Sequence, residues 1–197
     1  MKSLNFVVAA VGLALISAPA AAQDQGMGSL SDQFVSAVQK SDGDKATQLI
    51  QSHPTIIDAR DSKGDTGLII AIGRGDSDWT GFMLNNGADP NLAGASGDTP
   101  LIEAAKVGFD DAVPWLLGLG AKVDATNKMG ETALIIAVQQ RDTPMVRALL
   151  EAGANPDRTD AAAGYSARDY ATRDPRARDI LKLIDNKKPK PAASAAN

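Results

Sequence analysis

The sequence predicts an all-α solenoid, in which short helix-turn-helix units stack along one axis and loops project from them. Two recurring patterns predict this fold class. One stretch occurs three times at a constant spacing, as GDTGLIIAI, GDTPLIEAA and GETALIIAV, starting at Gly64, Gly97 and Gly130. A second set of glycines, toward the end of each unit, has the same spacing: Gly87, Gly120 and Gly153. A constant period of this length is typical of chains built from stacked repeats.

Each repeated stretch carries the signals of a first helix. A threonine is a suitable N-cap, because its hydroxyl accepts from a backbone N–H that the helix leaves unpaired; these residues are Thr66, Thr99 and Thr132. Pro100 follows its cap at the first helical position, where a missing N–H costs nothing. The next apolar residues are three and four apart, as on one helix face. Gly75 and Gly108 are expected to end these helices with a positive φ.

A second helix is predicted in each unit, over about 78–85, 111–119 and 144–152. The stretch that follows has no helical pattern and is expected to be an extended loop or a tight hairpin. Pro114 lies about one turn into its helix, which it is expected to shorten or kink. Helices this short are unstable alone in water, so each unit must bury its apolar face against its neighbours.

The repeat pattern also sets the expected domain organisation. The last unit is longer by one residue, because Gly164 lies one position further from Gly130 than the constant spacing of the earlier glycines predicts. Terminal units need a polar outer face, and the final helix at about 175–185 has charges on all sides but one. The predicted segments are a signal peptide at 1–22, a linker at 23–29, a capping unit at about 30–60, repeats at about 61–93, 94–126 and 127–159, a C-terminal capping unit at about 160–185 and a disordered tail at 186–197.

The first residues have the three parts of a secretory signal. Lys2 supplies a positive start, residues 6–16 are apolar apart from Gly12, and small residues follow at Ala20–Ala22. The apolar run is too short to span a bilayer, which takes about 20 residues. The chain has no cysteine, so neither disulfides nor a lipid anchor on cysteine are expected. We expect export to a bacterial periplasm, or alternatively secretion, without stable membrane insertion.

Composition argues against several functional classes. The chain has 20 basic and 24 acidic residues, and an acidic balance disfavours nucleic acid as a partner. One histidine, His53, and no cysteine exclude cysteine nucleophiles and sites with two histidines. No phosphate-binding glycine loop is present. We therefore predict no catalytic residue, no metal and no cofactor, and expect Trp79 and Trp115 to be core or partly buried residues of the second helices.

Basic residues gather at the C-terminal end. Residues 173–190 contain seven bases and three acids. Two interpretations remain open for this segment: a solvated capping helix with a tail, or a contact for an acidic partner or an anionic lipid surface.

Over residues 30–185 the sequence resembles the ankyrin-repeat family. The residues that carry the resemblance are Thr-Pro-Leu-x-x-Ala at 99–104, its variants one period before and after, and Gly-Ala-Asp-x-Asn at 87–91. Two departures recur. The histidine that follows the leucine in the family is replaced by Ile69, Ile102 and Ile135, so the stack should depend more on apolar packing. Arg141 stands where the other units have glycine, and Arg141→Gly is expected to raise the melting temperature slightly.

The resemblance implies a non-catalytic, monomeric scaffold that binds a protein through its loop tips and concave surface. A secreted factor that acts on a host protein by the same surface is the alternative, and an enzyme on a repeat scaffold is a further one that the residue inventory opposes. Carried over by position, the candidate protein-binding residues are Ser62, Lys63, Asp65, Arg74, Ala95, Ser96, Asp98, Lys106, Val107, Lys128, Met129, Glu131, Gln139 and Gln140. The positions beside them have structural duties in the repeat, whereas these residues are expected to have none. Met129 is the most suggestive, since an exposed apolar side chain at a loop tip has no packing reason.

Overall fold

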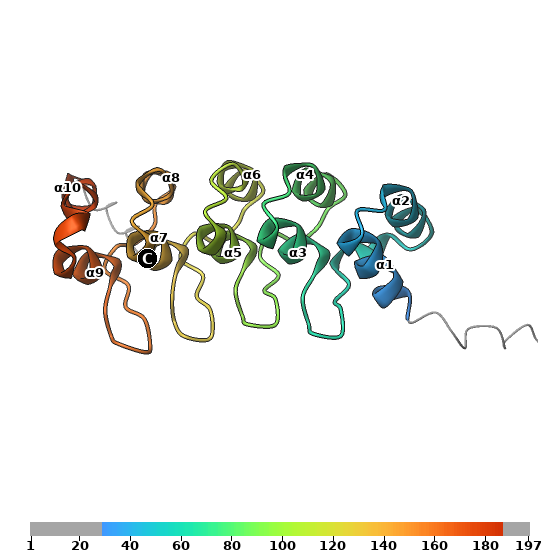
Figure 1. Ribbon diagram of the computed structural model, residues 1–197, viewed down its shortest axis with the longest axis horizontal. Helices are drawn as coiled ribbons and strands as arrows, with labels where there is room; N and C mark the ends of the chain where they lie inside the picture. The colour runs from blue at the N-terminus through green and yellow to red at the C-terminus, as the bar shows by residue number, and fades with distance from the viewer. Residues whose placement is uncertain (1–28, 187–197) are drawn as a thin grey trace, which may run out of the picture.

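The structure is a computed structural model in which residues 29–186 are described (Figure 1). The predicted signal peptide, most of the predicted linker and the predicted tail after residue 186 lie outside the described residues. Within residues 29–186 there is no strand, and only isolated β-bridges occur. The helices are α1 Leu30–Gln39, α2 Gly43–Ser52, α3 Gly67–Gly73, α4 Ser77–Asn85, α5 Pro100–Val107, α6 Ala112–Gly118, α7 Ala133–Gln140, α8 Thr143–Glu151, α9 Ala167–Arg173 and α10 Arg178–Asn186, with short 3₁₀ helices η1 Pro54–Asp58 and η2 Pro175–Ala177.

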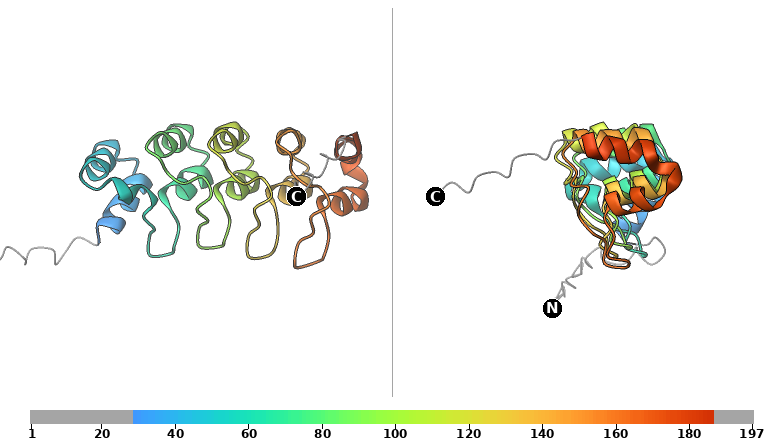
Figure 2. Two further views of the ribbon diagram at one scale, coloured as in Figure 1. Left: turned by 180° about the vertical axis from the view of Figure 1, so that it is seen from behind. Right: turned by 90° about the vertical axis from the view of Figure 1, so that its left-hand side faces the viewer.

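The helices lie in two rows, which confirms the predicted all-α solenoid. The odd-numbered helices form an inner row, in which each helix packs on the next and on the outer helix of its own pair. The even-numbered helices form the outer row (Figure 1). The loops between units project from the side of the inner row, and the view along the long axis shows them together on that side (Figure 2). We call these loops the first to fourth hairpins, at residues 59–66, 86–99, 119–132 and 152–166. The exposed side of the inner row together with the hairpins is called the inner face.

The core lies between the two rows and continues through the stack. α7 is its centre: all six residues from Ala133 to Val138 are buried, because α5 and α9 flank this helix and α8 covers it. The isoleucines at the departure from the family pattern are also buried, namely Ile69, Ile102 and Ile135. Apolar packing therefore occupies these positions, as the sequence predicted.

The predicted N-caps of the inner helices are confirmed. The hydroxyls of Thr66, Thr99 and Thr132 accept from the backbone N–H three residues later, at 3.3, 3.3 and 3.2 Å. Ser166 does the same for α9 at 3.1 Å, and Asp169 completes a capping box there. Each cap depends only on a stretch of four residues. It is therefore present also in the last unit, whose sequence differs from the other repeats.

A second set of polar residues joins neighbouring units. The acid or amide at the end of each unit accepts from a backbone N–H of the following unit: Asp58 from Asp89 at 3.0 Å, Asn91 from Lys122 at 2.8 Å and Asp124 from Asn155 at 2.9 Å. These bonds each join residues 31 apart in sequence and form a ladder along the stack. The recurrence of this residue therefore has a structural cause.

The outer helices differ slightly from the predicted ranges. α6 has seven residues, whereas α4 and α8 have nine. Pro114 is the third residue of the shortened α6. The backbone N–H groups of the first helical turn have no acceptor within the helix, so a proline, which lacks this N–H, is tolerated there. The predicted final helix is divided, because Pro175–Ala177 form η2 and α10 begins at Arg178.

The turns between paired helices have the predicted positive φ. Gly75 and Gly108 have φ of 64° and 68°, and Arg141 has φ of 60° at the equivalent position. The sequence did not indicate that the Arg141 guanidinium also forms an ion pair with Asp174, at 3.0 Å. At Arg141 the positive φ therefore lowers the stability of the folded chain, while the ion pair with Asp174 raises it.

Arg141→Gly should stabilise the chain most clearly when the ion pair is already absent. The substitution removes a positive φ at a non-glycine residue, which costs roughly 1 kcal/mol. It also removes a surface ion pair, whose contribution is small. We expect a small rise in melting temperature in the wild-type background and a larger rise with Asp174→Asn, which keeps the cap of η2. An equal or smaller shift in the Asp174→Asn background would contradict this account.

Thr80 is a buried polar residue of α4 without a partner. Its side chain is fully buried, and its hydroxyl oxygen has no hydrogen bond within residues 29–186. An unpaired buried hydroxyl costs about 1–3 kcal/mol. We expect Thr80→Val, which keeps the shape, to raise the free energy of unfolding in urea by about 1 kcal/mol. Thr80→Ala is the matched control and should lower it, since it leaves a cavity; a Val variant less stable than wild type would show that the hydroxyl is satisfied.

Candidate functional site

The hairpin tips have one common backbone design. In the second hairpin the Gly94 N–H donates to the Asp98 carbonyl at 2.9 Å, and in the third the Asn127 N–H donates to the Glu131 carbonyl at 3.1 Å. The Asn127 side-chain oxygen also accepts from the backbone N–H groups of Met129 and Glu131, at 2.9 and 3.0 Å. The residues at the tips are therefore held by the chain before and after them, and they are presented in a fixed backbone conformation.

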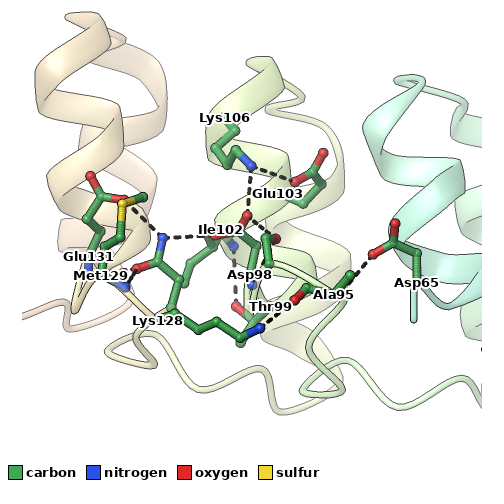
Figure 3. Close-up of polar contacts among 12 residues, drawn as sticks. Asp65, Ala95, Asp98, Thr99, Ile102, Glu103, Lys106, Lys128, Met129 and Glu131 are labelled. Carbon is green, nitrogen blue, oxygen red and sulfur yellow. Dashed lines mark hydrogen bonds and ion pairs between the residues drawn. The ribbon is translucent and has the colours of Figure 1, made fainter. Parts of the chain in front are cut away.

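Neighbouring hairpins are hydrogen-bonded to each other. Asp65 accepts from the Ala95 backbone N–H at 2.8 Å, and the Lys128 ammonium donates to the Ala95 carbonyl at 2.7 Å (Figure 3). The Met129 carbonyl accepts from the Ala161 N–H at 2.8 Å. The hairpins thus form one continuous layer along the stack, and several of the candidate residues hold it together.

Asp98 is the centre of a polar network at the base of the second hairpin (Figure 3). Its residue is 3% exposed, and its carboxylate accepts from the Lys106 ammonium at 2.7 Å, from the Ser96 hydroxyl and from the Asn127 amide at 2.9 Å. The same Asn127 amide group donates to the Glu131 carboxylate at 2.9 Å, and Lys106 lies 3.4 Å from Glu103. This network joins α5, the second hairpin and the third hairpin.

The network shifts the pKa values of its two central groups. Burial alone would raise the pKa of Asp98, but hydrogen bonds from Lys106, Ser96 and Asn127 outweigh it and lower the pKa. The pKa of Lys106 is raised by its hydrogen bond to Asp98, against a smaller opposing effect of burial. Both shifts favour the charged forms, so the pair is stabilised as an ion pair at neutral pH.

Other candidates on the inner face also contact neighbouring units. Arg74 donates to the carbonyls of Val38 and Gln39, at 3.2 and 2.9 Å, and pairs with Asp76. Gln140 donates to the Lys106 carbonyl at 2.9 Å. The premise that the candidates have no structural duties is therefore wrong for most of them: Asp65, Arg74, Ala95, Ser96, Asp98, Lys106, Lys128, Glu131 and Gln140. Gln139 interacts with Tyr170.

The other four candidates, Ser62, Lys63, Val107 and Met129, make no side-chain hydrogen bond or ion pair within the described range. Met129 is 54% exposed at the tip of the third hairpin, and Val107 is 43% exposed at the end of α5. Sequence reasoning selected these two, and the structure places both on the inner face. Whether any of the fourteen candidates binds a protein remains a prediction.

The expected burial of the two tryptophans holds for only one of them. Trp79 is buried in α4, but the expectation is wrong for Trp115, which is 39% exposed on α6. The repeat period contained the signal, because it aligns Trp115 with Phe82 and not with Trp79. His53 ends α2, where its backbone N–H donates to the Leu49 carbonyl at 2.8 Å.

The described residues show no arrangement suited to metal chemistry. No group of three or more His, Asp or Glu side chains in residues 29–186 is placed to hold a metal ion. In the same range no helix has the length and apolar character that a membrane span requires.

Comparison with known families identifies this architecture. A sequence model described as ankyrin repeats (3 copies) matches residues 34–127, 82–160 and 104–192, which together cover most of the chain. The chain belongs to the ankyrin-repeat family. No curated protein matches it. Ankyrin repeats are generally protein–protein interaction modules, and the family is typically a non-catalytic scaffold.

Proposed function

We propose that this ankyrin-repeat chain is a non-catalytic interaction module of the bacterial periplasm, which binds a protein partner through its hairpin tips and inner face. The observation that carries the proposal is Met129. Its side chain is 54% exposed, while its backbone N–H is bonded to Asn127 and its carbonyl to Ala161. An apolar side chain on a fixed backbone can be buried by a partner without the cost of ordering a loop.

Val107 supports the same surface. It is exposed at the C-terminal end of α5, on the helix whose Lys106 belongs to the Asp98 network. Two exposed apolar side chains, one on a hairpin and one at the end of α5, are suited to anchor a partner, with Ser62 and Lys63 at the polar rim. The scaffold beneath them requires no rearrangement on binding.

The binding proposal is tested by capture with matched variants. The chain starting at Gln23 is immobilised and incubated with periplasmic extract, beside a variant carrying Met129→Ala and Val107→Ala. Leu30→Ala is the control, because Leu30 is also an exposed apolar residue but lies on α1. Partners retained by wild type and the control, and lost by the double variant, support the proposal. Equal capture by all three would contradict the assignment of this surface.

Export is tested separately by fractionation. The residues at 1–22 support export, because they combine a positive start, an apolar run and small residues. We expect the full chain in the periplasm and a chain without residues 1–22 in the cytoplasm. Accumulation in the culture medium would instead favour the secreted factor that acts on a host protein, and cytoplasmic retention of the full chain would contradict export.

A further inference from the structure

A groove between two outer helices is a feature of the described surface that the repeat scaffold does not explain. It lies between α4 and α6, in the outer row and away from the hairpins (Figure 1). Its volume is about 450 Å³, and it is lined by Gly81, Leu84, Asn85, Pro114, Trp115, Gly118 and Leu119. The lining is apolar apart from one asparagine.

Two glycines line the groove. A Cβ added to Gly81 or to Gly118 would meet no atom within 4 Å. Neither residue has a positive φ, so the backbone does not require glycine at either position. Alanine would increase helix propensity there by roughly 0.5–1 kcal/mol. The glycines therefore reduce helix stability and leave space between the two helices.

The wall of the groove on α6 carries exposed apolar side chains. Trp115 is 39% exposed, and Leu119, which caps the end of α6 four residues later, is 54% exposed. The Trp115 ring is supported at its edge by Phe109, at 6.4 Å between ring centroids. A supported, exposed tryptophan beside an open groove is typical of an anchor point at a protein interface.

The N-terminal end of the groove carries two acids without an ion-pair partner in the described range. Asp78 precedes Gly81 by three residues and Asp111 precedes Trp115 by four, so helix geometry places both carboxylates at that end. Neither carboxylate makes a hydrogen bond or an ion pair within residues 29–186, and Asp110 precedes Asp111 in sequence. The nearest bases in sequence are already paired: Arg74 with Asp76 at 3.2 Å, and Lys106, on the inner row, with Asp98 at 2.7 Å.

The pKa of Asp110 also reflects the negative charge near the start of α6. Burial raises the pKa of Asp110, and the nearby carboxylates of Asp142 and Asp111 raise it further. These acids repel each other, and a cation placed among them would relieve the repulsion.

We propose that the α4–α6 groove docks a cationic amphipathic segment of a protein, with apolar side chains against Trp115 and Leu119 and lysine or arginine beside Asp78 and Asp111. An amphipathic helix in an apolar groove is a recurring mode of peptide recognition. The acidic end selects the charge of the segment and its direction in the groove. This surface is separate from the inner face, so it does not depend on the function proposed for the hairpins.

The test uses a fluorescent amphipathic peptide built only of leucine, alanine and lysine, with binding followed by anisotropy. The control peptide has glutamate at every lysine position. We expect the lysine peptide to bind at least about tenfold more tightly than the glutamate peptide. Equal binding of the two peptides would overturn the charge assignment.

Matched variants locate the binding site. Gly81→Ala with Gly118→Ala should weaken binding of the lysine peptide at least about tenfold while the melting temperature stays equal or rises. Asp78→Asn should weaken it severalfold, whereas Asp44→Asn should not, although Asp44 occupies the same place in the first turn of α2. Unchanged binding in the glycine variant, or equal losses for Asp44→Asn and Asp78→Asn, would overturn the proposal in favour of general attraction to an acidic protein. Met129→Ala with Val107→Ala should bind the peptide like wild type.

Discussion

Gly130→Ala should lower the free energy of unfolding by about 2–4 kcal/mol, from two independent costs. Gly130 has φ of 76°, which a residue with a Cβ adopts at a cost of about 1–2 kcal/mol. In addition, a Cβ at this position would lie 2.6 Å from the backbone nitrogen of Ala161 in the next hairpin. That nitrogen donates to the Met129 carbonyl, so the added methyl group would separate the third and fourth hairpins.

Gly153→Ala is the matched control for the second cost. Gly153 has φ of 99°, but a Cβ there would meet no atom within 4 Å. We expect this variant to lose only the conformational part, about 1 kcal/mol. Urea unfolding of both variants measures the difference, which is the contribution of close hairpin stacking. Equal losses would show that the hairpins can separate without cost.

Residues whose role is decided within one unit could be predicted from the sequence. The caps at Thr66, Thr99 and Thr132 depend on the four residues that follow them, and the sequence contains those residues. The positive φ at Arg141 followed from its alignment with Gly75 and Gly108. In each case the prediction needed only the repeat period and the local geometry of a helix end.

Contacts between units could not be predicted in the same way. Asp98 was selected as a free surface residue, but its partner Asn127 lies 29 residues further along the chain, in the next hairpin. Lys128 was selected for the same reason, and it bonds to Ala95, 33 residues earlier. A period predicts which positions are equivalent, but it does not show which side chains meet across the stack.

The exposed apolar residues divide between the two faces of the molecule. Met129 and Val107 lie on the inner face, where the family pattern directed the sequence prediction. Trp115 and Leu119 lie on the outer row, where they line the α4–α6 groove together with Gly81 and Gly118. The sequence predicted Trp115 to be core or partly buried, because a single repeat unit does not show how far apart neighbouring outer helices lie.

Asp98→Asn is expected to be the most destabilising change in the candidate site at neutral pH, by about 1–3 kcal/mol. The substitution keeps the shape of the side chain and one acceptor oxygen. It removes the negative charge of the carboxylate to which Lys106 and Ser96 donate hydrogen bonds. The loss is smaller than for a fully buried ion pair, because the Lys106 side chain is 42% exposed and can turn to solvent. Asp44→Asn removes a carboxylate that has no partner within residues 29–186, so it should change stability by less than about 0.5 kcal/mol.

The same substitution should change how stability depends on acid. The pKa of Asp98 is lower in the folded chain than its ordinary value of 3.8, so its contribution is complete above that value and is lost as pH falls through the folded pKa. The pKa values of Asp160, Asp169 and Asp174 are lowered too, that of Asp174 to about 2. We expect wild-type stability to fall below about pH 4, and the gap between wild type and Asp98→Asn to narrow over the same range. A gap that stays constant from neutral pH to pH about 2 would show that Asp98 acts through shape alone, with no contribution from its charge.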